Sequence, residues 1–391
     1  MDSGPLPAAL ADSSMQVLFG AGRFAELGRL IASLGARRAL LVSDPGLVAA
    51  GYVQRAARLI RDAGVETHVF DGARENPTTE HVDAGLETAR RAHIDFIVGL
   101  GGGSAMDCAK GINILLTNGG RIQDYWGVDK TTAPMLPSVL VPTTTGTGSE
   151  AQSFALISDA ESHQKMACGD RRPPGRGGLR PLAVVLDPEL TRTQPAAVAA
   201  ATGIDALSHA VETAGARVRN ERSLELSREA WRRLDANYER IVSGSADDTA
   251  LAEMLLGAHL AGAAIEASML GAAHACANPL TARFGVTHGV AVGLLLPHVV
   301  RYNSPSGSNP YDALCDDPQA HCRDAEALAQ RIESLLSVAR LPRTLRALHV
   351  PRAALAALAA EAATQWTAQF NPRAVGAREL LSIYEAAFGE R

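Results

Sequence analysis

The stretch DFIVGLGGGSAMDCAK, residues 95–110, joins a strand-like run to a helix-like run through consecutive glycines. Residues 95–104 predict a strand that ends in a glycine turn, and residues 104–117 predict the helix that follows. Glycines let a phosphate approach the backbone, and the free N–H groups at a helix start attract an anion. A tight strand-to-helix turn shows the same pattern, so this stretch alone leaves both interpretations open.

The same alternation surrounds this stretch on both sides. We predict strands within residues 37–44, 66–72, 137–150 and 182–187, and helices over 52–64 and 79–93. Strands and helices that alternate with short links predict a parallel sheet covered by helices. After about Pro188 the chain is Ala, Leu, Arg and Glu at helical spacing. We therefore expect an α/β domain over residues 1–187 and an all-α domain over residues 188–391.

The composition fits an ordinary globular protein of two domains. The chain has 391 residues, of which 47% are hydrophobic and 20% are charged. The net charge of −5 argues against nucleic acid or an anionic membrane as a partner. Residues 1–14 lack the basic and apolar regions of a signal peptide. Residues 255–277 are apolar but interrupted by His259, Glu266 and His274, which predicts a packed internal helix rather than a membrane span.

Cysteine and lysine usage are both informative. The five cysteines are odd in number and form no CxxC pair, which favours reduced thiols in a cytoplasm. Of the 37 basic residues only Lys110, Lys130 and Lys165 are lysine. Because lysine and arginine differ in shape and hydration, a lysine that persists in such a chain suggests a specific role. The Arg-rich segment 169–181 also contains Pro and Gly, and we expect it to be an exposed loop.

Two further strand ends carry polar groups that could contact a nucleotide. PTTTGTGSE, residues 142–150, offers hydroxyls and two glycines directly after a strand, although it could be simply a polar loop. Asp44 ends the strand at 37–44. Its carboxylate could bond a ribose 2′-OH and repel a 2′-phosphate, or it could cap the next helix.

Histidines and a carboxylate recur in the helical half. In TGIDALSHAVE, residues 202–212, Asp205 and His209 are four residues apart and share one helical face. Such a pair alone is more often a surface hydrogen bond than a metal site. HACANPLTARFGVTH adds His274 and His288, the latter after Thr287, which we expect to cap the next helix. One carboxylate and three imidazoles form a plausible set for a divalent metal with an open position.

Taken together, four motifs resemble those of the iron-containing (group III) alcohol dehydrogenases. These are GGGSAMDCAK, PTTTGTGSE, GIDALSHAVE and HGVAVGLLLPHVVRYN, which occur in order over nearly the whole chain. The resemblance implies the dehydroquinate synthase-like fold, with an N-terminal Rossmann-like domain, an all-α C-terminal domain and a cleft for NAD and one metal, Fe²⁺ or Zn²⁺. It also implies a cytoplasmic homodimer that interconverts an alcohol with its aldehyde or ketone.

The resemblance also assigns roles to individual residues. It implies four metal ligands, Asp205, His209, His274 and His288. The pyrophosphate would lie on Gly102, Gly103 and Ser104, with Asp107 near the nicotinamide. The cofactor would further contact Thr143, Thr144, Thr147, Lys165 at the ribose and Asn76 at the adenosine half. Asp44 falls where this family favours NAD over NADP.

One departure from the family concerns catalysis. The resemblance places Asn278 where well-studied members have a histidine that relays the alcohol proton. Asparagine can form hydrogen bonds but cannot titrate, so it cannot act as a general base. Either another group or water carries the proton, or Asn278 simply shapes the pocket. We take Asn278 and Asp107 as the candidate catalytic residues.

Three other interpretations remain at this stage. Dehydroquinate-synthase-like lyases share the architecture but need several lysines around a polyanionic substrate, and the helical half contains none. A glycerol-dehydrogenase-like zinc enzyme would normally use fewer ligands than four. A nucleotide-binding homologue with catalysis impaired by Asn278 would be expected to lose some of the four implied metal ligands, and all four are present.

Overall fold

The computed structural model describes residues 15–162, 164–305, 308–315 and 322–389, together with Pro7 and Leu10. Most of the N-terminal segment, for which we expect no signal peptide, lies outside these residues. The chain forms two compact units. One comprises Met1–Thr144 and Ser149–Gln194, and the other comprises Thr145–Gly148 and Pro195–Arg391.

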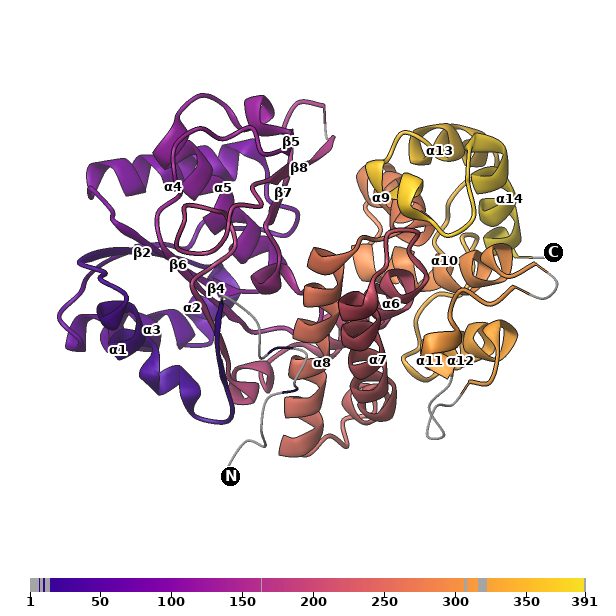
Figure 1. Ribbon diagram of the computed structural model, residues 1–391, viewed down its shortest axis with the longest axis horizontal. Coiled ribbons are helices and arrows are strands. Elements are labelled where there is room, and N and C mark those ends of the chain that lie inside the picture. The colour runs from indigo at the N-terminus through magenta and orange to yellow at the C-terminus, as the bar shows by residue number, and fades with distance from the viewer. Residues whose placement is uncertain are drawn as a thin grey trace. The chain divides into compact units, whose positions relative to one another are not determined.

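The α/β unit is built on a six-stranded sheet (Figure 1). Every strand pair in it is parallel, as predicted. Its strands lie in the order β1 (Gln16–Phe19), β9 (Ala183–Leu186), β6 (Ser138–Pro142), β4 (Phe96–Gly101), β2 (Arg38–Val42) and β3 (Glu66–Phe70). All six residues of β4 are buried, which explains the near-continuous apolar run that marks this strand in the sequence.

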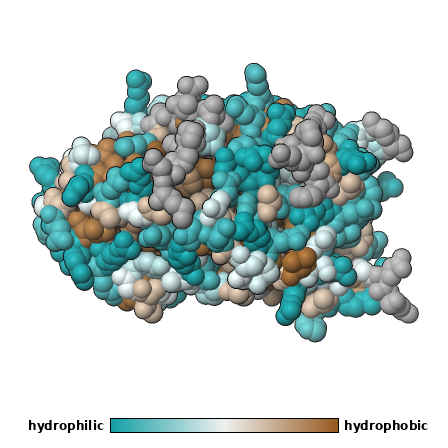
Figure 2. All heavy atoms as spheres, turned by 90° about the horizontal axis from the view of Figure 1, so that it is seen from below, coloured by the Kyte–Doolittle hydropathy of each residue, from teal (hydrophilic) through white to brown (hydrophobic). Residues whose placement is uncertain are grey.

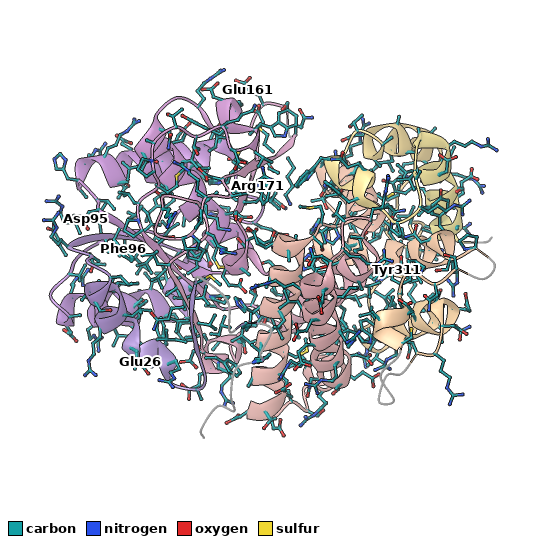
Figure 3. All side chains as sticks on the ribbon, viewed as in Figure 1. Glu26, Asp95, Phe96, Glu161, Arg171 and Tyr311 are labelled. Carbon is teal, nitrogen blue, oxygen red and sulfur yellow. The ribbon has the colours of Figure 1, made fainter. Side chains whose placement is uncertain are left out.

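Asp95, labelled in Figure 3, fixes the start of the central strands. Its Oδ1 accepts hydrogen bonds from the backbone N–H groups of Arg37 and Arg38, at 3.0 and 2.9 Å. The next residue, Phe96, is fully buried at the first position of β4. The carboxylate therefore satisfies backbone donors at the amino ends of the strands, and the glycine turn lies at the opposite ends.

Helices cover both faces of this sheet, and each face has its own apolar core. The helices α1 (Leu27–Ser33) and α3 (Tyr52–Asp62) lie on one side in Figure 1, and α4 (Thr79–Arg91) and α5 (Gly103–Asn118) lie on the other. The short helix α2 (Pro45–Ala49) follows β2. The predicted alternation of strands and helices in this half is confirmed.

A second sheet in the same unit is absent from the sequence prediction. It has three strands in the order β5 (Gly127–Val128), β8 (Lys165–Gly169) and β7 (Phe154–Ser158), with β7 and β8 antiparallel. Short strands that pair across a turn leave a weak sequence signal, because only a few residues carry the alternation.

The loop at 169–181 is more ordered than predicted. Arg172 forms a short ion pair with Asp170, a side chain that is only 1% exposed, and also donates to the Ala133 carbonyl at 2.9 Å. Leu179 is 2% exposed and belongs to an apolar core. Arg171 and Arg176 are exposed, as predicted for this loop. The prediction that the whole segment is exposed is wrong, because the buried Asp170 carboxylate anchors Arg172.

The second unit is helical throughout its described residues, as predicted. Its α-helices are α6 (Ala196–Gly215), α7 (Glu221–Val242), α8 (Asp248–Ala267), α9 (Ala272–Phe284), α10 (His288–Asn303), α11 (Asp312–Cys315), α12 (Ala325–Val338), α13 (Leu355–Ala362) and α14 (Ala377–Phe388). The prediction of a single internal helix over 255–277 is wrong, because two helices span these residues. The chain breaks between α8 and α9, and Gly271 precedes the first residue of α9.

Only α8, among the helices of the described residues, is long and apolar enough to cross a membrane. Of its most apolar window, 67% is buried inside the structure, and a core helix passes the same test. The face of the molecule in Figure 2 is mostly hydrophilic. These features give little support to a membrane span.

Candidate metal and cofactor sites

Helix α6 carries the first two predicted metal ligands on one face. Asp205 and His209 are 5% and 4% exposed, and His209 Nε2 lies 3.6 Å from Asp205 Oδ1. The predicted core side of the helix, with Ile204 and Leu207, is fully buried as well. Because both faces are buried, the Asp–His pair is not the surface hydrogen bond that the spacing alone would favour.

Two other helices bring the remaining histidines to this pair. His274, on α9, places its Nε2 3.5 Å from Asp205 Oδ1 and stacks on His209 with ring centroids 4.9 Å apart. His288 is the first residue of α10, and its ring centroid lies 5.3 Å from that of His274. Thr287 occupies the predicted N-cap position, although its side chain makes no capping hydrogen bond. Residues from three helices thus form one cluster, in which Asp205, His209 and His274 are buried and His288 is half-buried.

Ligand atoms of Asp205, His209 and His274 all lie within 4.8 Å of one another. Three atoms of this cluster are buried and form no hydrogen bond with any residue that the structure describes. They are Asp205 Oδ1, His209 Nδ1 and His274 Nε2. Buried polar atoms are normally paired, because leaving one unpaired costs about 1–3 kcal/mol. A carboxylate and imidazoles with unused lone pairs fit a divalent cation of the iron or zinc type.

Glu212 is a member of this cluster that the sequence analysis quoted but did not assign. It lies three residues after His209 on α6 and is 4% exposed. Its Oε1 accepts from the Ala273 N–H at 2.7 Å, and its Oε2 forms a short hydrogen bond with His274 Nδ1. A carboxylate on Nδ1 keeps the proton there and leaves Nε2 as the lone-pair donor. The available signal was a second carboxylate on the same face of an otherwise apolar helix.

The charges in this cluster depend strongly on one another. Burial disfavours the charged form of Asp205, but His209, His274 and His288 outweigh it and hold the pKa of this carboxyl well below its usual range. Burial lowers the pKa of His209 to about 4. His274 is also buried, yet the Glu212 and Asp205 carboxylates raise its pKa to about 9. The cluster therefore favours positive charge at the position of His274.

Asn278 lies one helical turn after His274 on α9 and is half-buried. Its Nδ2 donates to the Gln365 side-chain oxygen at 3.0 Å. Two neutral amides thus hold each other in place where the resemblance implies a titrating histidine. The orientation of Asn278 is fixed, but no proton can be taken up by this pair.

The start of α5 has the features of an anion site. Gly101 has a φ of +151°, a backbone conformation that favours glycine, and Gly102 is the N-cap with no side-chain cap. A Cβ on Gly102 would lie 3.3 Å from Thr144 Cγ2. Thr144 Oγ1 is buried and without a hydrogen-bond partner among the described residues. Gly103 and Ser104 are the first two residues of the helix, where N–H groups point outward.

Asp44 and Asn76 are two further predicted cofactor contacts in the α/β unit. Asp44 caps α2, with Oδ1 accepting from the Leu47 N–H at 3.1 Å, so the capping interpretation of this residue is confirmed. Its Oδ2 faces Gly101, where an added Cβ would lie 3.2 Å away. Asn76 is half-buried with a φ of +51°, just before Pro77. A ribose contact of Asp44 is compatible with its capping role, because the two use different oxygens.

The charges of two of the three lysines, Lys110 and Lys165, act on Asp107. Lys110 Nζ donates to the carbonyl oxygens of Ser149, Gln152 and Phe154 at 2.6, 2.9 and 2.8 Å. Asp107 Oδ1 accepts from Ser149 Oγ at 2.6 Å. Burial raises the pKa of Asp107, and the Lys110 and Lys165 charges oppose this shift. The structure thus brings Asp107 and Lys165 together and gives Lys110 a fully buried anchoring position.

The threonine-rich loop, residues 142–150, contains a threonine that contacts the glycine turn and two glycines that are tightly packed. Thr143 donates its N–H to the Gly101 carbonyl at 3.0 Å, which ties it to the glycine turn. The glycines are explained by packing within the helical unit. A Cβ on Gly146 would lie 2.3 Å from Thr202 Cβ, and one on Gly148 would lie 2.5 Å from Gly262 Cα. Thr147, between them, is half-buried.

Comparison with known proteins identifies the class. Residues 14–188 match the iron-containing alcohol dehydrogenases, and residues 199–388 match the C-terminal domain of the same family. The chain is 33% identical over 378 residues to the 1,3-propanediol dehydrogenase of Klebsiella pneumoniae, which covers 95% of this chain and 96% of that protein. It is 38% identical over 287 residues to alcohol dehydrogenase 4 of Schizosaccharomyces pombe, covering 73% of this chain and 67% of that protein.

Solved structures agree with these matches. A 1,3-propanediol oxidoreductase structure superposes with a TM-score of 0.86 at 33% identity, covering 95% of this chain and 98% of that chain. The sulfoacetaldehyde reductase of Bifidobacterium kashiwanohense, solved with NAD⁺, superposes with a TM-score of 0.86 at 27% identity, covering 96% and 97%. The fold and sequence together define an oxidoreductase that acts on alcohols. The chain belongs to the iron-containing alcohol dehydrogenase family.

Proposed function

We propose that this enzyme interconverts an alcohol with its aldehyde or ketone by using NAD and one divalent metal, Fe²⁺ or Zn²⁺, held by Asp205, His209, His274 and His288. The observation that carries the proposal is the buried group of Asp205, His209 and His274, whose ligand atoms lie within 4.8 Å of one another. The His288 ring lies beside that of His274. When bound, the metal would polarise the substrate oxygen as a Lewis acid, and the nicotinamide would donate or accept the hydride.

The chain's own residues would position the cofactor. The uncapped N–H groups at Gly103 and Ser104 would bind the pyrophosphate, with Gly102 leaving room for it beside Thr144. The free carboxylate oxygen of Asp44 would accept from a ribose hydroxyl, which supports NAD over NADP. The remaining cofactor contacts are proposed at Asn76, Asp107, Thr143, Thr147 and Lys165. This division of labour supports a cofactor domain at 1–187 and a metal-binding domain at 188–391.

The proton of the alcohol needs a route other than Asn278. The Asn278 amide is held by Gln365 at 3.0 Å and has no titratable proton. We infer that Asn278 orients a polar group beside the cluster and that water carries the proton away. By the family resemblance we also expect a homodimer in the cytoplasm, and the five unbridged cysteines support a reducing compartment.

The test is NADH oxidation with a panel of aldehydes and ketones, after anaerobic loading of the protein with Fe²⁺ in one arm and Zn²⁺ in the other. We expect turnover in at least one arm and its loss with a chelator. Metal content and NADH binding are measured in the same samples. Bound metal and bound NADH without turnover of any substrate in either arm would refute the proposal and favour a nucleotide-binding protein with impaired catalysis.

A further inference from the structure

Two cysteines of the helical unit lie within reach of each other. Cys315 ends α11, and Cys322 lies three residues before Ala325, the first residue of α12. Their Sγ atoms are 3.1 Å apart and share a thiol hydrogen bond. Both side chains are thiols in the structure, and neither takes part in the proposed metal or cofactor site.

Residues 316–321, between the two cysteines, lie outside the described part of the chain. Each sulfur also contacts the backbone on the far side of that segment. Cys315 Sγ lies 3.8 Å from the Asp324 carbonyl oxygen, and Cys322 Sγ lies 3.8 Å from the Leu314 carbonyl oxygen. The pair is therefore held by the elements on either side of it.

Those flanking elements are themselves well anchored. Tyr311, labelled in Figure 3 and 1% exposed, accepts from Asn303 Nδ2 at 2.8 Å just before α11. Arg228 Nε donates to the Ala313 carbonyl at 3.0 Å. At the other side, Asp324 caps α12 by accepting from the Ala327 N–H at 2.8 Å. Anchored backbones keep the two sulfurs in place, which favours intramolecular reaction between them.

The other three cysteines differ from Cys315 in access. Cys108, Cys168 and Cys276 are fully buried, and burial raises the pKa of each thiol. Cys322 is also buried, but Cys315 is partly exposed. The hydrogen bond that the Cys322 thiol donates to Cys315, together with burial, raises the pKa of Cys322 and keeps the proton on it. A small oxidant can therefore reach Cys315 first, and the thiolate is the reactive form.

We propose that Cys315 and Cys322 are a redox modification site that forms a reversible disulfide by exchange with low-molecular-weight disulfides such as oxidised glutathione. The Cys315 thiolate attacks one sulfur of the small disulfide, which breaks the S–S bond and releases one small thiol. Cys322 then attacks the Cys315 sulfur of the mixed disulfide and releases the second small thiol. Two protein thiols are oxidised, one small disulfide is reduced, and the two thiol protons leave with the released thiols.

The bond would join the end of α11 to the segment before α12. Closing this short loop covalently restricts the unfolded chain, so the oxidised protein should unfold at a temperature a few degrees higher than the reduced protein.

The experiment equilibrates the reduced full-length protein with glutathione buffers of increasing oxidised fraction, traps free thiols by alkylation and counts them after denaturation. We expect the count to fall from five to three. Cleavage before aspartate separates the two cysteines, because Asp316 and Asp317 lie between them, so a linked peptide pair identifies the bond. Cys322→Ser should stop at a glutathione adduct on Cys315, and Cys315→Ser should not react.

The matched control is Cys168→Ser, which removes a fully buried thiol elsewhere and should still form the 315–322 link. Three results would overturn the proposal. They are five free thiols at every buffer ratio, a glutathione adduct on Cys315 without a link in the unmodified sequence, and oxidation of the buried cysteines in place of this pair.

Discussion

Two clusters of buried polar side chains, one in each unit of the molecule, differ in their hydrogen bonding. Around Asp107 in the α/β unit, Lys110 Nζ donates to three carbonyl oxygens and Ser149 donates to the carboxylate. Around Asp205 in the helical unit, three buried nitrogen and oxygen atoms have no hydrogen-bond partner among the described residues.

This difference distinguishes two roles of buried polar side chains, which are to stabilise the fold and to bind a ligand. A cluster whose polar atoms are bonded to one another stabilises one local arrangement of the chain. A cluster with unused lone pairs is costly in the absence of a ligand, so its persistence indicates that something else completes it. The comparison predicts that substitutions in the helical cluster remove metal and activity, whereas substitution of Lys110 removes stability.

The largest effect is expected for Asp205→Asn. The substitution keeps the shape of the side chain but removes the charge that attracts a cation. We expect turnover to fall about 1,000-fold, which corresponds to several kcal/mol of lost transition-state stabilisation. Turnover and bound metal are measured on the same preparation. His68→Ala, at an imidazole that is paired only with Glu66 on the surface, is the control and should retain both. Normal metal content with normal turnover in Asp205→Asn would contradict the assignment.

How far the sequence could predict this site depends on how local each signal is. Asp205 and His209 could be paired from their spacing alone, since helical periodicity places them on one face. His274 and His288 are distant in sequence, so their residue types made a shared metal set plausible, and the family resemblance then assigned all four residues to it. Glu212 was missed because its role is a contact with another helix, through His274 Nδ1 and the Ala273 N–H. No spacing rule on α6 reveals that contact.

The fold shows the same division. The parallel sheet and its helices follow from repeated local patterns, and the family comparison confirms the fold class. The antiparallel pair β7–β8 depends on a pairing that five-residue strands encode weakly. The loop at 169–181 depends on Asp170, a buried carboxylate whose arginine partner could not be predicted from composition.

Lys110→Met should reduce stability. Lys110 is 3% exposed, and its removal leaves buried carbonyl oxygens without this donor and takes away one of the two lysine charges that act on Asp107. Removing one partner of a buried charged cluster typically costs about 3–5 kcal/mol. We expect a lower thermal unfolding midpoint with unchanged metal content per folded protein. Lys130→Met, at an exposed lysine, is the matched control and should unfold like the unmodified protein. An unchanged unfolding midpoint for Lys110→Met would contradict the claim that this cluster stabilises the fold.

Glu212→Gln sharpens the description of the helical cluster. The amide keeps the size of the side chain and an oxygen for the Ala273 N–H, but it loses the charge that holds the proton on His274 Nδ1. Partners of metal-binding histidines typically contribute about 10- to 100-fold to metal affinity. Competition with a chelator of known affinity measures this loss directly. Glu253→Gln, on α8 and paired with Arg233, should bind metal normally. Equal affinity in both variants would show that Glu212 does not position His274.

The smallest effect is expected at Asp170, where a satisfied cluster lies in a loop. Burial works against the charge of Asp170, but hydrogen bonds from Arg172 and Thr131 outweigh it and lower the pKa of the carboxyl below 3.8. A carboxyl whose pKa is lower in the folded state stabilises the protein above its unfolded pKa. That contribution is lost as the pH falls below the unfolded value and through the folded one.

Asp170→Asn should therefore unfold at a lower temperature than the unmodified protein at neutral pH, by the equivalent of about 1 kcal/mol, since Arg172 is one-third exposed and solvent screens the pair. The difference in midpoint should shrink as the pH falls below about 4, because the unmodified carboxyl then takes up a proton as well. Thermal unfolding of both proteins across this range measures it. A difference that stays constant with pH would mean that Asp170 acts through the shape of the loop and not through its charge.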